Sequence, residues 1–278
     1  MNKTLIISDL DGTLLNNEGE ISETNEKWIK RFKRKGGLFT LATGRMEKSI
    51  HPYIEKLEID TPVIVYNGAM IYSPVTNKAL YEKHLFASRS MWNELLNTNL
   101  EIGIFIYKDG KPFVLKRNSI VDVFEVKEKV NCVQGKLDDF IDVPITKILA
   151  IMKEESRHED LPELKAMETK LIEGKFECDT VFSESNYLEI LPKGCSKGIA
   201  LIELVSNLKV KDLKIIALGD NLNDISLLMA ADTGVAVQNA RHGLKEMADR
   251  VIEKTNDEDA VAHVIQEVLA DERKDYDK

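Results

Sequence analysis

The stretch Leu5-Ile6-Ile7-Ser8-Asp9-Leu10-Asp11-Gly12-Thr13 decides the fold, because a short apolar run passes directly into a cluster of acidic residues. Leu5 to Ile7 predict a strand that is buried on both faces, as in a parallel sheet. Asp9 and Asp11 are two residues apart and would share one face of that strand, and Gly12 lets the chain turn immediately afterwards. Two converging carboxylates suit a reaction in which one attacks and the other moves a proton.

Two simpler interpretations of the D-x-D-G pattern exist. It could be a turn closed by Asx hydrogen bonds, or the opening of a calcium-binding loop. The calcium loop is disfavoured, because an EF-hand counted from Asp9 needs Gly and Glu where this chain has Leu14 and Glu20. A helix, not an apolar strand, would also have to precede it.

Both ends of the chain alternate apolar strands with amphipathic helices, which indicates βαβ units around a parallel sheet. Strands are expected at 5–7, 38–42, 63–66, 214–218 and 234–237, and helices at 24–35, 46–57, 196–208, 223–231 and 260–270. Ser22 is the expected N-cap of the first helix and Gly36-Gly37 its stop. The charged tail 271–278 is expected to fray.

The middle of the chain has a different pattern. Expected strands at 102–107, 112–115, 146–152, 180–183 and 188–191 mix with helices at 89–97, 119–126 and 161–171, which predicts an α+β insert with an antiparallel sheet. The fold class is therefore α/β, a Rossmann-like parallel-sheet core with an inserted α+β domain. The expected boundaries are 1–81 and 194–278 for the core and 82–193 for the insert.

Polar residues follow each core strand, at the edge where parallel sheets bind ligands. They are Asp9, Asp11, Thr43, Gly44, Arg45, Asn67, Gly68, Asp220, Asn223 and Asp224. Four carboxylates at one edge would repel one another unless a cation compensates, and their hard oxygens favour Mg²⁺. The sequence therefore predicts a metal site there.

Each segment also has a structural explanation. Asp220 or Asn223 could be a helix N-cap, although one cap accounts for only one of the three polar residues at 220, 223 and 224. Thr43-Gly44-Arg45 could be a simple turn. Lys197 begins a helix, where a cation opposes the helix dipole, and this placement hints at an anionic partner.

The composition limits the classes of function. The chain has 278 residues, 43% of them hydrophobic, and carries 38 Lys and Arg against 47 Asp and Glu, a net charge of −9. An acidic balance argues against a nucleic-acid backbone binder. No apolar run approaches the roughly 18 residues of a membrane span, and no secretory signal is visible. Three cysteines without a C-x-x-C pair indicate reduced thiols and a cytoplasmic protein. The sequence does not indicate the oligomeric state.

Together, the motifs D-x-D-G-T at 9–13, L-A-T-G-R at 41–45, Lys197 and G-D-N-L-N-D at 219–224 resemble the haloacid dehalogenase-like (HAD) superfamily. Y-N-G-A at 66–69 and A-V-Q-N-A at 236–240 are similar to the Cof-type branch, which carries a type IIB cap. The resemblance covers the core, about 1–81 and 194–278. Across the middle it rests on position and size.

The resemblance implies an Mg²⁺-dependent phosphatase acting on a small soluble phosphate ester, such as a sugar phosphate. Asp9 would attack phosphorus, and Asp11 would protonate the leaving oxygen and then activate water. The resemblance implies that phosphoryl oxygens are held by Thr43, Lys197 and Asn223, and the strand-end positions add Gly44, Arg45 and Asn67 to the substrate-binding set. The metal set is Asp9, Asp11 (through its backbone carbonyl), Asp220 and Asp224.

Two other functions remain open from the sequence. A sugar phosphomutase could use the same core chemistry, and a metal- or phosphate-sensing module could bind without turnover. The second would be expected to lack Asp11 or Lys197, and both are present. Substrate choice is expected to depend on the insert near 184–189. Tyr187 and Glu189 are candidates there, although a plain alternating strand explains them equally well.

Overall fold

The structure is a computed structural model that describes residues 3–97, 101–153, 161–208 and 210–276. The chain divides into two compact units. The first comprises 1–44, 50–80 and 196–278, and the second comprises 45–49 and 81–195. The changes at 80/81 and 195/196 lie close to the boundaries expected from the sequence, but the short segment 45–49 belongs to the second unit.

The first unit is built on a five-stranded parallel sheet in the order β16-β15-β14-β1-β2. Its strands are β1 (Thr4–Ser8), β2 (Leu38–Leu41), β14 (Lys214–Gly219), β15 (Thr233–Ala236) and β16 (Arg250–Val251). Every residue of β1 is buried, because helices cover both faces of a parallel sheet. The structure therefore confirms the expected Rossmann-like α/β core.

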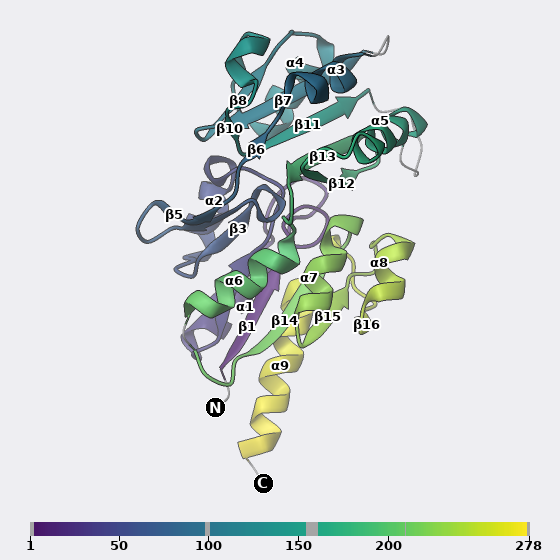
Figure 1. The fold of residues 1–278 in the computed structure, drawn as a ribbon. Helices are drawn as coiled ribbons and strands as arrows, with labels where there is room; N and C mark the ends of the chain where they lie inside the picture. Colours follow the sequence, from purple (N-terminus) through teal and green to yellow (C-terminus); the bar gives the residue numbers. More distant parts are fainter. Residues whose placement is uncertain (1–2, 98–100, 154–160, 209, 277–278) are drawn as a thin grey trace. The chain divides into compact units, whose positions relative to one another are not determined.

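The helices of this unit are α1 (Glu23–Arg34), α6 (Lys197–Leu208), α7 (Ile225–Ala230), α8 (His242–Met247) and α9 (Ala260–Tyr276), together with most of α2 (Glu47–Leu57), whose residues 47–49 belong to the second unit. Ser22 caps α1 as expected, since its hydroxyl accepts a 3.0 Å hydrogen bond from the backbone N–H of Asn25. Helix α7 packs against α6 and against β14 and β15, whereas α1 packs beside α9 and β2. In Figure 1, α6 and α7 lie in front of this sheet.

The strand expected at 63–66 is confirmed as β3 (Val63–Val65), and a parallel bridge between Ala42 and Ile64 links it to the β2 segment. Strand β3 also pairs antiparallel with β4 (Met70–Ser73), which precedes β5 (Lys78–Glu82), and these two strands were not predicted from the sequence. The antiparallel pairing arises because the chain reverses at the 3-10 turn η1 (Tyr66–Gly68), which brings the following segment back against β3.

One expectation for the core was wrong, and it concerns the tail. Helix α9 continues through Tyr276, so residues 271–276 are helical, not frayed. Glu, Arg and Lys are good helix formers, and they extend a helix that is already anchored. Residues 277–278 lie outside the described part of the chain.

The second unit has a six-stranded sheet in the order β12-β13-β11-β7-β8-β9, antiparallel except between β8 and β9. Its strands are β7 (Ile102–Lys108), β8 (Lys111–Val114), β9 (Val133–Gln134), β11 (Lys147–Met152), β12 (Cys178–Glu184) and β13 (Tyr187–Pro192). A small ribbon joins β6 (Leu85–Phe86) to β10 (Pro144–Ile145). This is the α+β insert expected from the sequence.

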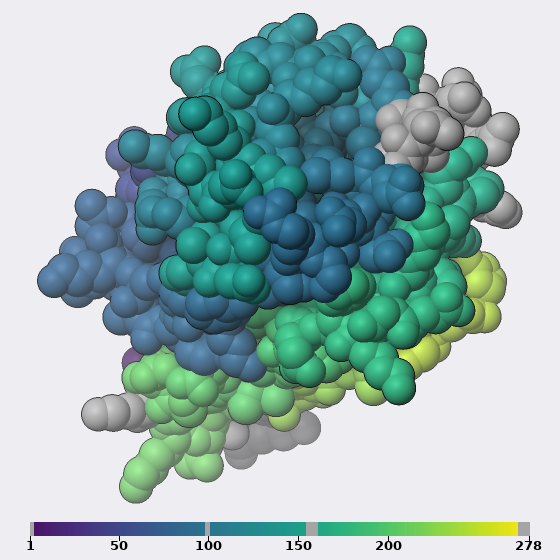
Figure 2. All heavy atoms as spheres, turned by 45° about the horizontal axis from the view of Figure 1, so that its top comes forward, coloured from purple at the N-terminus to yellow at the C-terminus, as the bar shows by residue number. Residues whose placement is uncertain are grey.

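Helices α3 (Arg89–Leu96) and α5 (Pro162–Glu173) pack together and share one buried apolar cluster with the sheet. The cluster includes the fully buried Trp92, whose indole N–H donates a 3.0 Å hydrogen bond to the carbonyl of Phe140. Helix α4 (Ser119–Glu128) packs on β7, where Phe124 contacts Phe105. Figure 2 shows a face built largely from this blue-to-teal part of the chain.

Among the described residues, no helix combines the length and the apolar character that crossing a bilayer requires.

Candidate active site

Acidic residues follow two neighbouring strands at one edge of the core sheet. Strands β1 and β14 run parallel with Ser8 opposite Leu218, so Asp9 and Asp220 both follow the last paired residues. The backbone N–H of Asp9 donates a 2.9 Å hydrogen bond to the carbonyl of Leu218, which continues the ladder to that residue. The sheet therefore fixes the backbone position of Asp9.

The carboxylates of Asp9, Asp220 and Asp224 gather at this edge, with one oxygen of each within 4.8 Å of the others. Asp9 and Asp224 are buried, and Asp220 is half-buried. Asp11 is exposed and lies outside this group of three. The structure thus brings together three of the four carboxylates that the sequence selected.

Lys197 is the cation of this cluster. Its ammonium group donates hydrogen bonds to Oδ1 of Asp9 at 2.7 Å and to Oδ1 of Asp224 at 2.6 Å. The side chain is completely inaccessible to solvent, although it stands at the start of α6. These two carboxylates compensate the unfavourable interaction between the Lys197 cation and the dipole of α6, which the sequence predicted.

Asp224 organises the loop that carries Asp220. Its second oxygen, Oδ2, accepts hydrogen bonds from the backbone N–H groups of Asp220 at 3.0 Å and Asn221 at 3.1 Å. These contacts occur at the 3-10 turn η3 (Leu222–Asp224), before α7 begins. A Cβ added at Gly219 would lie 2.5 Å from Cβ of Asp224, so this approach requires glycine.

Thr13 belongs to the site, although the sequence analysis did not give it a role. Its hydroxyl donates a 2.9 Å hydrogen bond to Oδ1 of Asp220, which orients that carboxylate across 207 residues of sequence. Gly12, at a φ of +74°, lies against the same carboxylate, and a Cβ there would be 2.5 Å from Oδ2 of Asp220. Gly12-Thr13, at the end of the D-x-D-G-T motif, is the sequence feature from which this contact could have been predicted.

The electrostatics of the cluster favour a bound cation. Burial and the neighbouring Asp224 raise the pKa of Asp9 to about 7, and burial and Asp9 raise the pKa of Asp220 well above its ordinary value. The two carboxylates raise the pKa of Lys197 despite its burial. One lysine does not offset three carboxylates, and oxygen ligands in this number suit a hard divalent cation.

A second set of predicted residues lies around Asn67. Thr43 is buried, and its carbonyl accepts a 3.0 Å hydrogen bond from the backbone N–H of Asn67. A Cβ added at Gly44 would lie 2.9 Å from Nδ2 of Asn67, so the amide rests on that glycine. The amide of Asn223 donates a 3.1 Å hydrogen bond to Oδ1 of Asn67. Arg45 belongs to the second unit, where its guanidinium pairs with Glu128 at 3.4 Å.

The two insert candidates are already engaged with other side chains. Glu189 is buried and accepts hydrogen bonds from Lys147 at 2.6 Å and from Ser183 at 3.0 Å. The hydroxyl of Tyr187 accepts a 3.2 Å hydrogen bond from Lys127. For Glu189, these contacts favour the structural interpretation over substrate binding.

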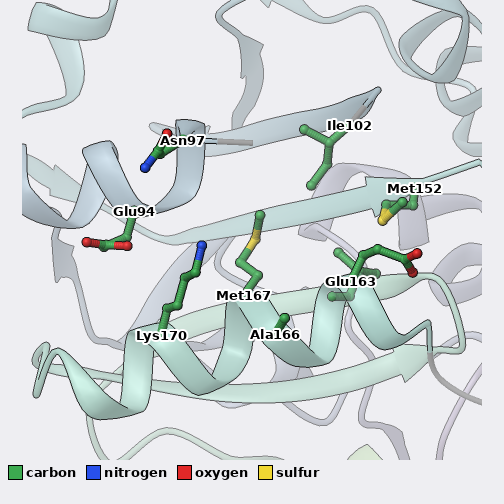
Figure 3. A pocket seen from close by; sticks show the side chains of 9 residues that line it. Glu94, Asn97, Ile102, Met152, Glu163, Ala166, Met167 and Lys170 are labelled. Carbon is green, nitrogen blue, oxygen red and sulfur yellow. The ribbon is translucent and has the colours of Figure 1, made fainter. Parts of the chain in front are cut away.

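The second unit also contains a pocket of about 170 Å³ (Figure 3). Its lining is Glu94, Asn97, Ile102, Met152, Glu163, Leu164, Ala166, Met167 and Lys170. None of these is a residue that the sequence selected, so the pocket adds no member to the candidate site.

Comparison with known proteins identifies the family. Residues 6–265 match the family model of haloacid dehalogenase-like hydrolases. The chain is 28% identical to 5-amino-6-(5-phospho-D-ribitylamino)uracil phosphatase YitU of Bacillus subtilis, over 96% of this chain and 97% of that protein. It is 31% identical to phosphatase YwpJ of the same organism, over 95% and 99% respectively. A haloacid dehalogenase-like hydrolase from Bacteroides thetaiotaomicron superposes with a TM-score of 0.79 at 27% identity, over 96% of this chain and 99% of that one.

The fold and the aspartate cluster define a hydrolase with a parallel-sheet core and an inserted cap, so the second unit is called the cap below. The chain belongs to the haloacid dehalogenase-like hydrolase family, in its Cof-type branch with a type IIB cap. It is an enzyme of the phosphoric monoester hydrolase class.

Proposed function

We propose that the protein is an Mg²⁺-dependent phosphatase that hydrolyses a small soluble phosphate ester through an aspartyl-phosphate intermediate. The observation that carries the proposal is the contact of Lys197 with both Asp9 and Asp224 beside Asp220. This arrangement supports the proposal, because it combines the buried Asp9 carboxylate, a fixed cation and the Asp220 carboxylate at one edge of the sheet. Phosphoryl transfer needs positioning and charge neutralisation more than covalent chemistry from the protein.

In the first step, a carboxylate oxygen of Asp9 attacks phosphorus and the bond from phosphorus to the ester oxygen breaks. Asp11 gives its proton to the departing oxygen, so the leaving group is released as an alcohol. In the second step, Asp11 takes a proton from water, whose oxygen attacks phosphorus. The bond to Asp9 then breaks, which releases inorganic phosphate and restores both carboxyl groups.

The remaining predicted residues have binding roles in this proposal. Thr43, Lys197 and Asn223 hold phosphoryl oxygens, and Gly44, Arg45 and Asn67 complete the substrate-binding set. Mg²⁺ would be held by Asp9, Asp220 and the backbone carbonyl of Asp11, with support from Asp224. It supplies charge neutralisation between the nucleophile and an anionic phosphate.

We propose a phosphorylated metabolite, such as a sugar phosphate, as the substrate. The relatives support small substrates of more than one kind: YitU is named for a ribitylaminouracil phosphate, and pyridoxal phosphate phosphatase YbhA of Escherichia coli is 28% identical to this chain. A cytoplasmic location is also proposed, supported by three cysteines that are all free thiols.

The test compares phosphate release from p-nitrophenyl phosphate, with and without Mg²⁺, by the wild type and by Asp9→Asn. We expect Mg²⁺-dependent release by the wild type and none by the variant. Asp60→Asn, an exposed substitution in the same unit, should keep full activity. Wild-type turnover by Asp9→Asn would show that the nucleophile is another residue. A metabolite screen with Mg²⁺ then identifies the substrate, and a sugar phosphate that is isomerised without phosphate release would indicate a mutase.

A further inference from the structure

The turn at Tyr66–Gly68 holds an unusual backbone. Three successive residues have positive φ angles, 52° at Tyr66, 53° at Asn67 and 97° at Gly68. Tyr66 is completely buried, and a bulky residue rarely adopts this left-handed conformation. Such strain persists where surrounding structure enforces it, and it concentrates at functional sites.

This turn contacts segments that carry other site residues. The backbone N–H of Asn67 bonds to the carbonyl of Thr43, as described above. Gly68 lies so close to the carbonyl of Ser196, the residue before Lys197, that a Cβ at Gly68 would collide with it. Asn67 is therefore fixed between the loop that follows β2 and the start of α6.

The Asn67 side chain meets Asn223 in a buried pair of amides. The single bond between them leaves two buried atoms, Nδ2 of Asn67 and Oδ1 of Asn223, without a hydrogen-bond partner among the described residues. Exchanging nitrogen and oxygen in both amides reverses the bond, but it again leaves one N–H group and one carbonyl oxygen unsatisfied. Whichever assignment holds, the pair offers a ligand one donor and one acceptor.

Most buried polar groups have partners, so an unsatisfied pair beside a predicted anion site points to a ligand. We propose that Asn67 and Asn223 together bind a phosphoryl oxygen that carries a proton, and so distinguish phosphate from sulfate. This inference rests on the proposed function, which brings a phosphoryl group to this edge of the core.

A hydroxyl on phosphorus satisfies both groups, because it donates to the carbonyl oxygen and accepts from the amide N–H. An oxygen of sulfate, which carries no proton near neutral pH, can only accept, and it leaves the carbonyl oxygen buried without a donor. A site built to hydrogen-bond a hydroxyl rejects the analogue that lacks it for this reason. The pair acts on binding, and it takes no part in the bond-breaking steps.

The experiment measures binding of inorganic phosphate and of sulfate by titration calorimetry, in the presence of Mg²⁺ at pH 6 and pH 8. We expect wild type to bind phosphate at least about tenfold more tightly than sulfate at pH 6. The preference should persist at pH 8, because the hydrogen phosphate dianion still carries one proton whereas sulfate carries none. Equal affinity for the two anions at pH 6 would overturn the proposal without any variant.

Asn67→Gly removes the amide and keeps a residue that tolerates the left-handed backbone. We expect it to lose about tenfold in phosphate affinity and to bind the two anions almost equally. Asn77→Gly is the matched control, because Asn77 has a φ of 55° at another turn of the same unit. It should keep the wild-type ratio. Selectivity that survives in Asn67→Gly, with a control-like melting temperature, would also overturn the inference.

These outcomes separate the inference from the function on which it rests. Turnover of p-nitrophenyl phosphate with no preference for phosphate over sulfate would leave the phosphatase intact and remove the role of the amide pair. Absence of turnover by the wild type would count against the phosphatase, while calorimetry would still report the selectivity.

Discussion

Nζ of Lys197 lies 2.6 Å from Oδ1 of Asp224, and neither side chain is accessible to solvent. A buried ion pair that loses one member leaves the other charge uncompensated, which costs about 3–5 kcal/mol. We therefore expect Lys197→Met to lower the free energy of unfolding by about this amount in EDTA and to abolish phosphatase activity.

Urea denaturation measures the stability effect of Lys197→Met. Lys27→Met, on an exposed position of α1, is the control and should change the free energy of unfolding by less than about 0.5 kcal/mol. If the two variants were equally stable, the buried lysine would not be needed to offset Asp9 and Asp224.

Thr13 should tune metal affinity through Asp220. Thr13→Val keeps the shape of the side chain and removes the 2.9 Å hydrogen bond that orients the carboxylate. Loss of such an outer contact typically weakens metal binding about 10–100-fold. Thr13→Ser keeps the hydroxyl and should bind Mg²⁺ almost as wild type does. Calorimetric titration with Mg²⁺ measures both, and an unchanged affinity in Thr13→Val would show that Asp220 needs no such support.

Two glycines with positive φ angles allow the cost of backbone strain to be compared with the cost of a steric collision. Gly19 (φ +75°) has no atom within 4 Å of an added Cβ, whereas Gly68 (φ +97°) faces the Ser196 carbonyl. Gly19→Ala should cost only the left-handed conformation, about 1–2 kcal/mol. Gly68→Ala should cost about 1–3 kcal/mol more, because the backbone must also move. Denaturation midpoints measure the stability loss of both variants. Equal losses would mean that the backbone at Gly68 moves away from Ser196 without a further cost in stability.

The Lys147–Glu189 pair of the cap should behave as a unit. Glu189→Leu alone removes the carboxylate that pairs with the buried ammonium group of Lys147 and is expected to cost about 3–5 kcal/mol. The double variant Lys147→Met, Glu189→Leu should recover most of that loss, since apolar replacement of a buried pair is often neutral. The comparison uses urea denaturation of both variants, and simply additive losses would contradict it.

The cysteines should resist alkylation in the native state. Burial raises the pKa of Cys132 to about 12 and the pKa values of Cys178 and Cys195 to about 11, from about 9. At pH 8 iodoacetamide should modify the unfolded chain much faster than the folded one, because the thiolate is the reactive form. The thiols ionise more easily when unfolded, so the free energy of unfolding should fall as pH rises above 9. Rapid native labelling at pH 8 would contradict this burial.

The features that the sequence predicted correctly depend on local interactions, whereas those that it missed depend on contacts between distant residues. The strand β1 and the capped helix α1 follow from local patterns, an apolar run and a Ser N-cap, and both were confirmed. Strands β4 and β5 were not predicted, because the positive φ angles of Tyr66 and Asn67 reverse the chain and only their surroundings impose that backbone. The order of the motifs in the sequence was enough to identify the family.

The sequence by itself determined which residue types stand at the strand ends: paired aspartates, a lysine at a helix start, and asparagines after β3 and β14. Only the tertiary structure decided how they pair. It places Lys197 between Asp9 and Asp224, and it lets the Thr13 hydroxyl donate a hydrogen bond to Asp220. It also leaves one donor and one acceptor of the Asn67–Asn223 amide pair without a partner among the residues that the structure describes. These contacts join residues up to 207 positions apart. Packing of the whole sheet sets such distances, and no local pattern encodes them.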